Sequence, residues 1–166
     1  MDNLHAILGL SSGIKPTTLG DVMVQLASAN GSTAMSETVN SKIRGFVVDD
    51  HLIIRRGLSM IVQDQIDMVL VGEASDDWEA VETISILKSD VVLMDIELSG
   101  ISSVEATKEI SESNAHIALL ILTSHEREDL LFQSLRVGAA GYTLKSTDTE
   151  GLLAAIRTVN TGGICH

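Results

Sequence analysis

The sequence predicts a doubly wound α/β fold, in which helices cover both faces of a parallel five-stranded sheet. From Ile43 onward, short β-branched and apolar runs alternate with segments of ten or more residues that have helical periodicity. Strands that are buried on both faces have such continuous apolar runs, and parallel strands need a helical crossover between them. Five strand and helix units with right-handed crossovers give an open, doubly wound sheet.

The predicted elements follow one another in strict alternation. The strands are the five runs that are rich in Val, Ile or Leu, at residues 43–48, 68–73, 91–94, 117–122 and 141–144. The helices are the segments between and after them, at residues 52–64, 77–88, 103–113, 127–137 and 148–160. Apolar residues recur at helical spacing in these segments, as at Ala80, Val81, Ile84 and Leu87, and at Leu152, Ala155, Ile156 and Val159. These stripes are predicted core faces.

Residues 1–42 differ from the rest of the chain in composition. They are rich in Gly, Ser, Thr and Asn and contain the only proline, Pro16. We interpret them as a weakly structured N-terminal appendage with one short helical stretch at residues 19–29, which is either marginal or able to dock elsewhere. A second interpretation is that translation begins at Met35.

The bulk properties exclude several classes of function. The chain has a formal net charge of −12, whereas binding of a nucleic-acid backbone needs clustered Lys and Arg. Its single cysteine, Cys165, rules out an internal disulfide and is too little for a structural zinc site. The apolar runs are too short to span a bilayer, and the N-terminus lacks the pattern of a signal peptide. We therefore expect a cytoplasmic protein without membrane association.

Side chains that can carry chemistry follow four of the predicted strands. Asp49 and Asp50 follow the first strand, Asp95 the third, Thr123 the fourth and Lys145 the fifth. Each has a simpler explanation when it is considered alone, because Asp and Thr commonly cap helices and lysine is common on surfaces. Together, however, they occupy one edge of one sheet, where doubly wound folds bind their ligands.

This combination of side chains suits phosphoryl chemistry. Carboxylates hold a hard cation such as Mg²⁺, while the metal, an ammonium and a hydroxyl together neutralise and orient a phosphoryl group. Asp95 is then the expected nucleophile, since carboxylates form aspartyl phosphates.

The motifs at these strand ends resemble those of the receiver domain of bacterial two-component response regulators, over residues 43–163. They are the Val48-Asp49-Asp50-His51 turn, Asp95, Thr123 and the run Gly141-Tyr142-Thr143-Leu144-Lys145. The resemblance implies a flavodoxin-like (βα)5 fold with strand order 2-1-3-4-5. It also implies a sensor histidine kinase or phosphotransfer protein as partner, and homodimerisation on phosphorylation.

Further details are similar to the LuxR/NarL-type subfamily, whose output is a helix-turn-helix domain. They include Arg55-Arg56-Gly57-Leu58 after the acid pair and the run from Val137 to Tyr142. Residues 164–166 then correspond to the start of a truncated linker, and the output domain is absent. The expected function is therefore control of transcription, with DNA contacted only through that missing domain.

The resemblance also assigns roles at the site. It implies that Asp50, Asp95 and the backbone carbonyl of Glu97 bind Mg²⁺, with Asp49 acting indirectly. Lys145 is expected to pair with the phosphoryl or acceptor oxygens.

Two further roles concern the switch and the lifetime of the phosphoryl group. Thr123 is expected to move to the phosphoryl group and Tyr142 to change rotamer, which alters the face made by the fourth helix, fifth strand and fifth helix. Glu97 and His125 occupy positions that tune phosphoryl lifetime in this family. The family often has a proline four residues after the phosphorylated Asp, where this chain has Ser99.

Two alternatives to a phosphorylated receiver stay open at this point. A phosphohydrolase of the haloacid-dehalogenase type also forms an aspartyl phosphate, but it has a second Asp two residues after its nucleophile. Here His51 and Glu97 stand two residues after Asp49 and Asp95. A degenerate receiver that binds partners without phosphorylation is the other alternative. In the leading interpretation the chain is not a metabolic enzyme, because a receiver catalyses only its own phosphotransfer and dephosphorylation.

Overall fold

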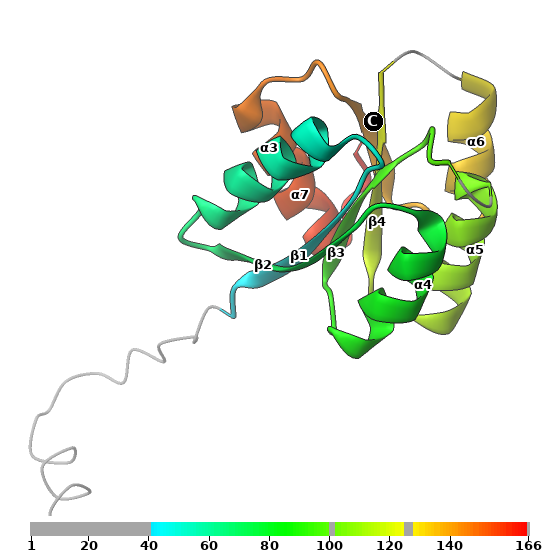
Figure 1. The fold of residues 1–166 in the computed structure, drawn as a ribbon, viewed down its shortest axis with the longest axis horizontal. Helices are drawn as coiled ribbons and strands as arrows, with labels where there is room; N and C mark the ends of the chain where they lie inside the picture. Colours follow the sequence, from blue (N-terminus) through cyan, green and yellow to red (C-terminus); the bar gives the residue numbers. More distant parts are fainter. Residues whose placement is uncertain (1–40, 100–101, 125–127, 166) are drawn as a thin grey trace, which may run out of the picture. The chain divides into compact units, whose positions relative to one another are not determined.

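The computed structural model describes residues 41–99, 102–124 and 128–165, and these residues form a five-stranded parallel sheet with helices on both faces (Figure 1). The strands are β1 (Ile43–Val48), β2 (Met68–Ala74), β3 (Val91–Asp95), β4 (Ala118–Thr123) and β5 (Gly141–Leu144). The helices are α3 (Leu52–Gln63), α4 (Asp77–Ile86), α5 (Ser103–Ser113), α6 (Glu128–Arg136) and α7 (Thr149–Asn160). The spatial order of the strands is β2-β1-β3-β4-β5. The predicted flavodoxin-like fold and strand order are therefore confirmed.

Two apolar clusters form the core, one on each face of the sheet. One lies between the sheet and α4, α5 and α6, and includes Phe46, Ile84 and Ile110. The other lies under α3 and α7 and includes Val62 and Ile156. Figure 1 shows this division, with α3 and α7 on one side of the sheet and the other three helices on the opposite side. The strands are buried on both faces because each layer of helices covers one of them.

The register of the strands aligns the residues at the carboxyl edge. Asp95 pairs with Leu122 across β3 and β4, and Thr123 pairs with Leu144 across β4 and β5. Asp95 and Thr123 are the last residues of their strands, rather than the first residues of the following loops. Because the strands are parallel, the side chains at the carboxyl ends of β1, β3, β4 and β5 come to one edge, as predicted.

The predicted boundaries differ from the observed ones by a few residues at most. The helix predicted at 77–88 ends at Ile86, because Lys88 has a positive φ of 50° that a helix cannot contain. The predicted strand at 117–122 begins at Ala118, because the amide of Ile117 closes a turn onto Asn114. The N-terminal appendage up to residue 40, with its predicted helix at 19–29, lies outside the described residues.

The chain between α4 and β3 provides a test of backbone strain. Lys88 is exposed and left-handed, and Arg44 donates hydrogen bonds of 2.9 Å to the backbone carbonyls of Leu87 and Lys88, which hold this conformation. Lys88→Gly is expected to raise the free energy of unfolding by about 0.5–1 kcal/mol, because glycine adopts this conformation without a Cβ clash. Chemical denaturation measures the change.

The matched control replaces a lysine inside a helix. Lys108→Gly in the middle of α5 is expected to lower the free energy of unfolding by about 1 kcal/mol. A loss of stability in both variants would contradict the interpretation of Lys88 as a strained residue.

None of the helices in the described ranges combines the length and the apolar composition that a bilayer crossing needs.

Candidate functional site

The turn after β1 carries two carboxylates with different surroundings. Asp49 is fully buried, and its Oδ1 atom accepts a hydrogen bond of 2.8 Å from the amide of His51. Asp50 is partly exposed, and His51 Nδ1 lies 2.7 Å from its Oδ1 atom. The N-cap residue of α3 is His51 itself. Helix capping therefore does not explain this acid pair.

Asp95 ends β3 and is also buried. Its Oδ1 atom accepts a hydrogen bond of 3.2 Å from the amide of Glu97, as an aspartate does when it closes a local turn. The next helix, α5, begins only at Ser103. Asp95 is therefore no helix cap, and the simpler explanation for this residue also fails.

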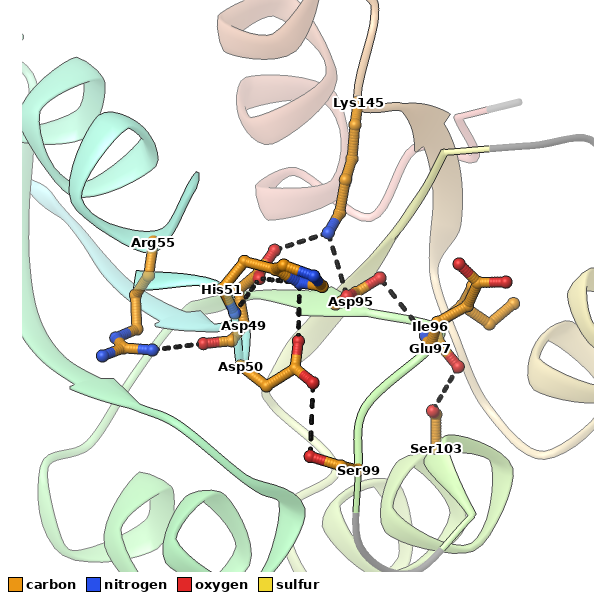
Figure 2. A network of polar contacts seen from close by, with 10 residues as sticks. All are labelled: Asp49, Asp50, His51, Arg55, Asp95, Ile96, Glu97, Ser99, Ser103 and Lys145. Carbon is orange, nitrogen blue, oxygen red and sulfur yellow. Dashed lines mark hydrogen bonds and ion pairs between the residues drawn. The ribbon is translucent and has the colours of Figure 1, made fainter. Parts of the chain in front are cut away.

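Lys145 joins the two buried carboxylates. Its Nζ atom lies 2.6 Å from Asp49 Oδ2 and 2.9 Å from Asp95 Oδ2. The side chains of Lys145, Asp49 and Asp95 are 11%, 0% and 2% exposed. Figure 2 shows the ammonium reaching down from the end of β5 between the two acids. Residues at the ends of three strands thus form one buried cluster of two negative charges and one positive charge.

Burial and charge shift the pKa values within this cluster. Burial raises the pKa of Asp95, and the Asp49 carboxylate adds to that effect, while the hydrogen bonds from Lys145 and from the Glu97 amide oppose it. Burial alone would lower the pKa of Lys145, but its bonds to Asp49 and Asp95 outweigh burial and raise it. Lys145 is therefore a permanent cation, and Asp95 is a more basic carboxylate than an exposed aspartate.

The partly exposed Asp50 is held from the loop after β3. Ser99 Oγ donates a hydrogen bond of 3.2 Å to Asp50 Oδ2 (Figure 2). Ser99 stands where the receiver pattern often has proline, and here its hydroxyl ties the β3–α5 loop to the acid pair. The same loop is anchored further on, where Ser103 Oγ donates to the carbonyl of Ile96 at 2.5 Å.

The acidic edge fits a divalent cation. One ligand atom from each of Asp49, Asp50, His51 and Asp95 lies within 4.8 Å of the others. Three of these four groups are carboxylates, and oxygen ligands are those that Mg²⁺ prefers. The donor chemistry therefore agrees with the predicted cofactor.

The two residues predicted to switch lie on neighbouring strands. Thr123 is fully buried at the end of β4, and its carbonyl accepts a hydrogen bond of 2.8 Å from the amide of Lys145. Tyr142 on β5 is half-buried and packs against the core cluster that contains Ile121 and Leu131. Thr123 is therefore at the acidic edge beside Lys145, and Tyr142 is on the adjacent strand, β5.

The two predicted lifetime residues are placed differently. Glu97 is exposed and contributes its amide to Asp95. The role predicted for its backbone carbonyl stays a prediction. His125 lies outside the described residues.

Several contacts at the site were not predicted from the sequence. They include the contact of His51 with Asp50, the bond from Ser99, and a bond of 2.5 Å from Arg55 Nη1 to the carbonyl of Asp49. Arg55 lies in the first turn of the helix that follows the acid pair, which is the only signal that could have suggested a contact. Nothing in the sequence pattern points to Ser99.

The fold and this acidic edge define a receiver-type α/β domain, and the comparisons with known proteins agree. A family model described as the response regulator receiver domain matches residues 46–157. The oxygen regulatory protein NreC of Staphylococcus haemolyticus is 44% identical over 117 residues, which make up 70% of this chain and 54% of NreC. The chain belongs to the response regulator receiver domain family, and its relatives are of the LuxR/NarL type.

Solved structures agree with this assignment. A two-component response regulator of the LuxR family from Aurantimonas sp. SI85-9A1 is 32% identical, with a TM-score of 0.71, over 76% of this chain and 90% of that one. The signal receiver domain of the response regulator NarL from Mycobacterium tuberculosis is 27% identical, with a TM-score of 0.70, over 74% of this chain and 98% of that one. The chain spans about half the length of the curated relatives it matches.

Proposed function

We propose that this chain is the phosphoacceptor of a two-component signalling system and that Asp95 receives the phosphoryl group. The observation that carries the proposal is the position of Asp95, a buried carboxylate with a raised pKa beside the ammonium of Lys145 and the acid pair. A basic carboxylate is the better nucleophile, and the fixed positive charge beside it favours the approach of an anionic phosphoryl donor.

The transfer itself uses few groups. An Asp95 oxygen attacks the phosphorus of a phosphohistidine on a sensor kinase or phosphotransfer protein; the O–P bond forms as the P–N bond breaks, and the histidine leaves. Lys145 stabilises charge on the acceptor and phosphoryl oxygens. Asp50, Asp95 and the Glu97 carbonyl would hold Mg²⁺, with Asp49 acting indirectly, and the bound ion would neutralise phosphoryl charge. The domain catalyses only its own phosphorylation and dephosphorylation.

The response to phosphorylation is proposed to pass through Thr123 and Tyr142. The Thr123 hydroxyl would move toward the new phosphoryl oxygens, and the space it leaves would admit the ring of Tyr142. The face formed by α6, β5 and α7 would change with it. Glu97 and His125 are proposed to set how long the phosphoryl group lasts.

By similarity to its LuxR-type relatives, we propose that phosphorylation promotes homodimerisation and regulates transcription in the cytoplasm. DNA would be contacted through a helix-turn-helix output domain of the LuxR type.

Replacing the acceptor tests the proposal. Wild type and Asp95→Asn are incubated with a small-molecule phosphodonor, with and without Mg²⁺, and their intact masses are measured. Wild type is expected to gain one phosphoryl group only with Mg²⁺, and Asp95→Asn is expected to gain none. Asp64→Asn, an equal change at an exposed residue after α3, serves as the control and is expected to match wild type. An equal gain on Asp95→Asn and wild type would overturn the proposal.

A further inference from the structure

Two adjacent arginines on the first turns of α3 have different surroundings. Arg55 and Arg56 both pair with Glu73 on β2, at 3.5 Å and 3.2 Å. The side chain of Arg55 is only 14% exposed, whereas that of Arg56 is 68% exposed. Of the two, Arg55 also donates a hydrogen bond of 2.5 Å to the backbone carbonyl of Asp49 (Figure 2). Arg55 thus has a contact with the acidic turn that its neighbour lacks.

The Asp49 carbonyl that accepts this bond lies between the two acids of the turn. It belongs to the peptide bond that joins Asp49 to Asp50, and this peptide unit is planar. The amide on the other side of Asp49 donates a hydrogen bond of 3.2 Å to the carbonyl of Ala74 on β2. Both peptide units that flank Asp49 are therefore held, one by the sheet and one by Arg55. Fixing the second unit also fixes the direction in which the chain enters Asp50.

The turn needs such a restraint because it concentrates negative charge. The Asp49 side chain is held by Lys145 and by the amide of His51. Asp50 is partly exposed, and its side-chain contacts come from His51 and Ser99. Without a cation, the adjacent carboxylates repel each other, and rotation of the peptide unit between them would let them move apart.

We propose that Arg55 is a positioning residue that orients the Asp49–Asp50 peptide, so that Asp50 faces the cation site together with Asp95. The proposal rests on the function proposed above. Arg55 acts through the backbone of Asp49, and Glu73 in turn fixes the guanidinium from β2. Arg56, which shares Glu73 but does not reach the turn, has no such role.

If Arg55 acted only as a positive charge, its removal would change the Mg²⁺ affinity in the opposite direction from the loss of a positioning bond. A positive charge near a cation site weakens cation binding, so its loss alone would tighten Mg²⁺ binding. Loss of the positioning bond would weaken it, because Asp50 would have to be reoriented on binding. The sign of the change in Mg²⁺ affinity therefore separates a positioning role from a bystander charge.

The test compares Arg55→Met with Arg56→Met, each of which keeps an apolar stem and removes one positive charge. Mg²⁺ affinity is measured by isothermal titration calorimetry, and fluorescence of the single tryptophan, Trp78, provides a second readout. Arg55→Met is expected to raise the Kd about tenfold, whereas Arg56→Met is expected to leave it within twofold of wild type or lower it. Phosphorylation of Arg55→Met is expected to approach the wild-type rate at saturating Mg²⁺.

Several outcomes would overturn the proposal. A Kd for Arg55→Met equal to or lower than that of Arg56→Met would show that the guanidinium acts only as a charge. If Arg55→Met does not fold, Arg55→Lys and Arg56→Lys are compared instead, and a Kd ratio below twofold overturns the proposal. If wild type binds Mg²⁺ and is phosphorylated while the variants do not differ, Arg55 alone is misassigned. If wild type does neither, the proposed function fails and this proposal fails with it.

Discussion

Lys145→Ala is expected to lower the free energy of unfolding by about 3–5 kcal/mol at pH 8. The ammonium is the shared partner of Asp49 and Asp95, at 2.6 Å and 2.9 Å, and both carboxylates are buried. Its removal leaves two negative charges close together in a poorly solvated site, and the cost of an uncompensated buried charge is large. Urea denaturation of wild type and variant measures the difference.

The same variant has a predictable dependence on pH and on cations. Without Lys145, the pKa of Asp95 rises further, because burial and the Asp49 charge then act without opposition from the ammonium. A carboxyl group whose pKa is raised in the folded state makes the folded protein less stable as the pH rises. The deficit of Lys145→Ala is therefore expected to shrink at pH 5. Mg²⁺ is expected to stabilise the variant more than wild type, because a cation at the acidic edge replaces the missing charge.

Lys108→Ala is the control for loss of a lysine. Lys108 is exposed and pairs with Glu112 at 3.9 Å on the surface of α5. Its removal is expected to change the free energy of unfolding by no more than about 0.5 kcal/mol at either pH. If Lys145→Ala behaved like Lys108→Ala, the buried cluster would not depend on its ammonium.

The fold could be predicted because the hydrophobic periodicity of this chain indicates both its strands and helices and the topology that they form. Runs such as Val91 to Met94 are buried on both faces, so their composition identifies them as central strands without any knowledge of their neighbours. The site followed from the fold, because parallel strands bring Asp50, Asp95 and Lys145 to one edge whatever the details of the loops. Element boundaries were less certain, since the end of α4 depends on the left-handed backbone of Lys88.

The pairing within the site could not be predicted in the same way. The pattern gives no reason why Lys145 should contact Asp49 as well as Asp95, because that depends on how far a flexible side chain extends from β5. The contact of Arg55 with a backbone carbonyl is equally invisible, since any arginine on that turn of α3 could have faced solvent as Arg56 does. Such contacts are decided by tertiary packing.

At the start of α4, a sequence pattern that is favourable for a helix gives no indication that one of its carboxylates is buried. Asp76, Asp77 and Glu79 all suit the first turn of a helix. Asp76 is the N-cap, and its side chain accepts a hydrogen bond of 2.9 Å from the amide of Glu79. Asp77, one residue later, is fully buried, and no other described residue donates a hydrogen bond to either of its oxygens. Helix propensity cannot distinguish these two aspartates.

Asp77→Asn is expected to stabilise the domain in a pH-dependent way. Burial, and then the charges of Asp76 and Asp50, raise the pKa of Asp77 to about 6, against a usual value of 3.8. Its folded pKa is raised, so the full stability is present below the usual value of 3.8 and is lost progressively as the pH rises to about 6, because the unfolded chain ionises first. The loss is complete above that value and amounts to at most about 3 kcal/mol. Asparagine keeps the shape of the side chain and never carries the charge.

The expected gain from Asp77→Asn is therefore about 3 kcal/mol at pH 8 and roughly half as much at pH 5, because wild type is by then largely protonated at this position. Urea denaturation across this range measures it. Asp64→Asn removes the same charge from an exposed residue after α3 that does not contribute to the raised pKa of Asp77. That variant is expected to stay within about 0.5 kcal/mol of wild type at every pH. Parallel stability profiles for Asp77→Asn and wild type would mean that Asp77 does not titrate in this range. Profiles that converge toward low pH would identify Asp77 as a buried charge that the fold retains at a cost to its stability.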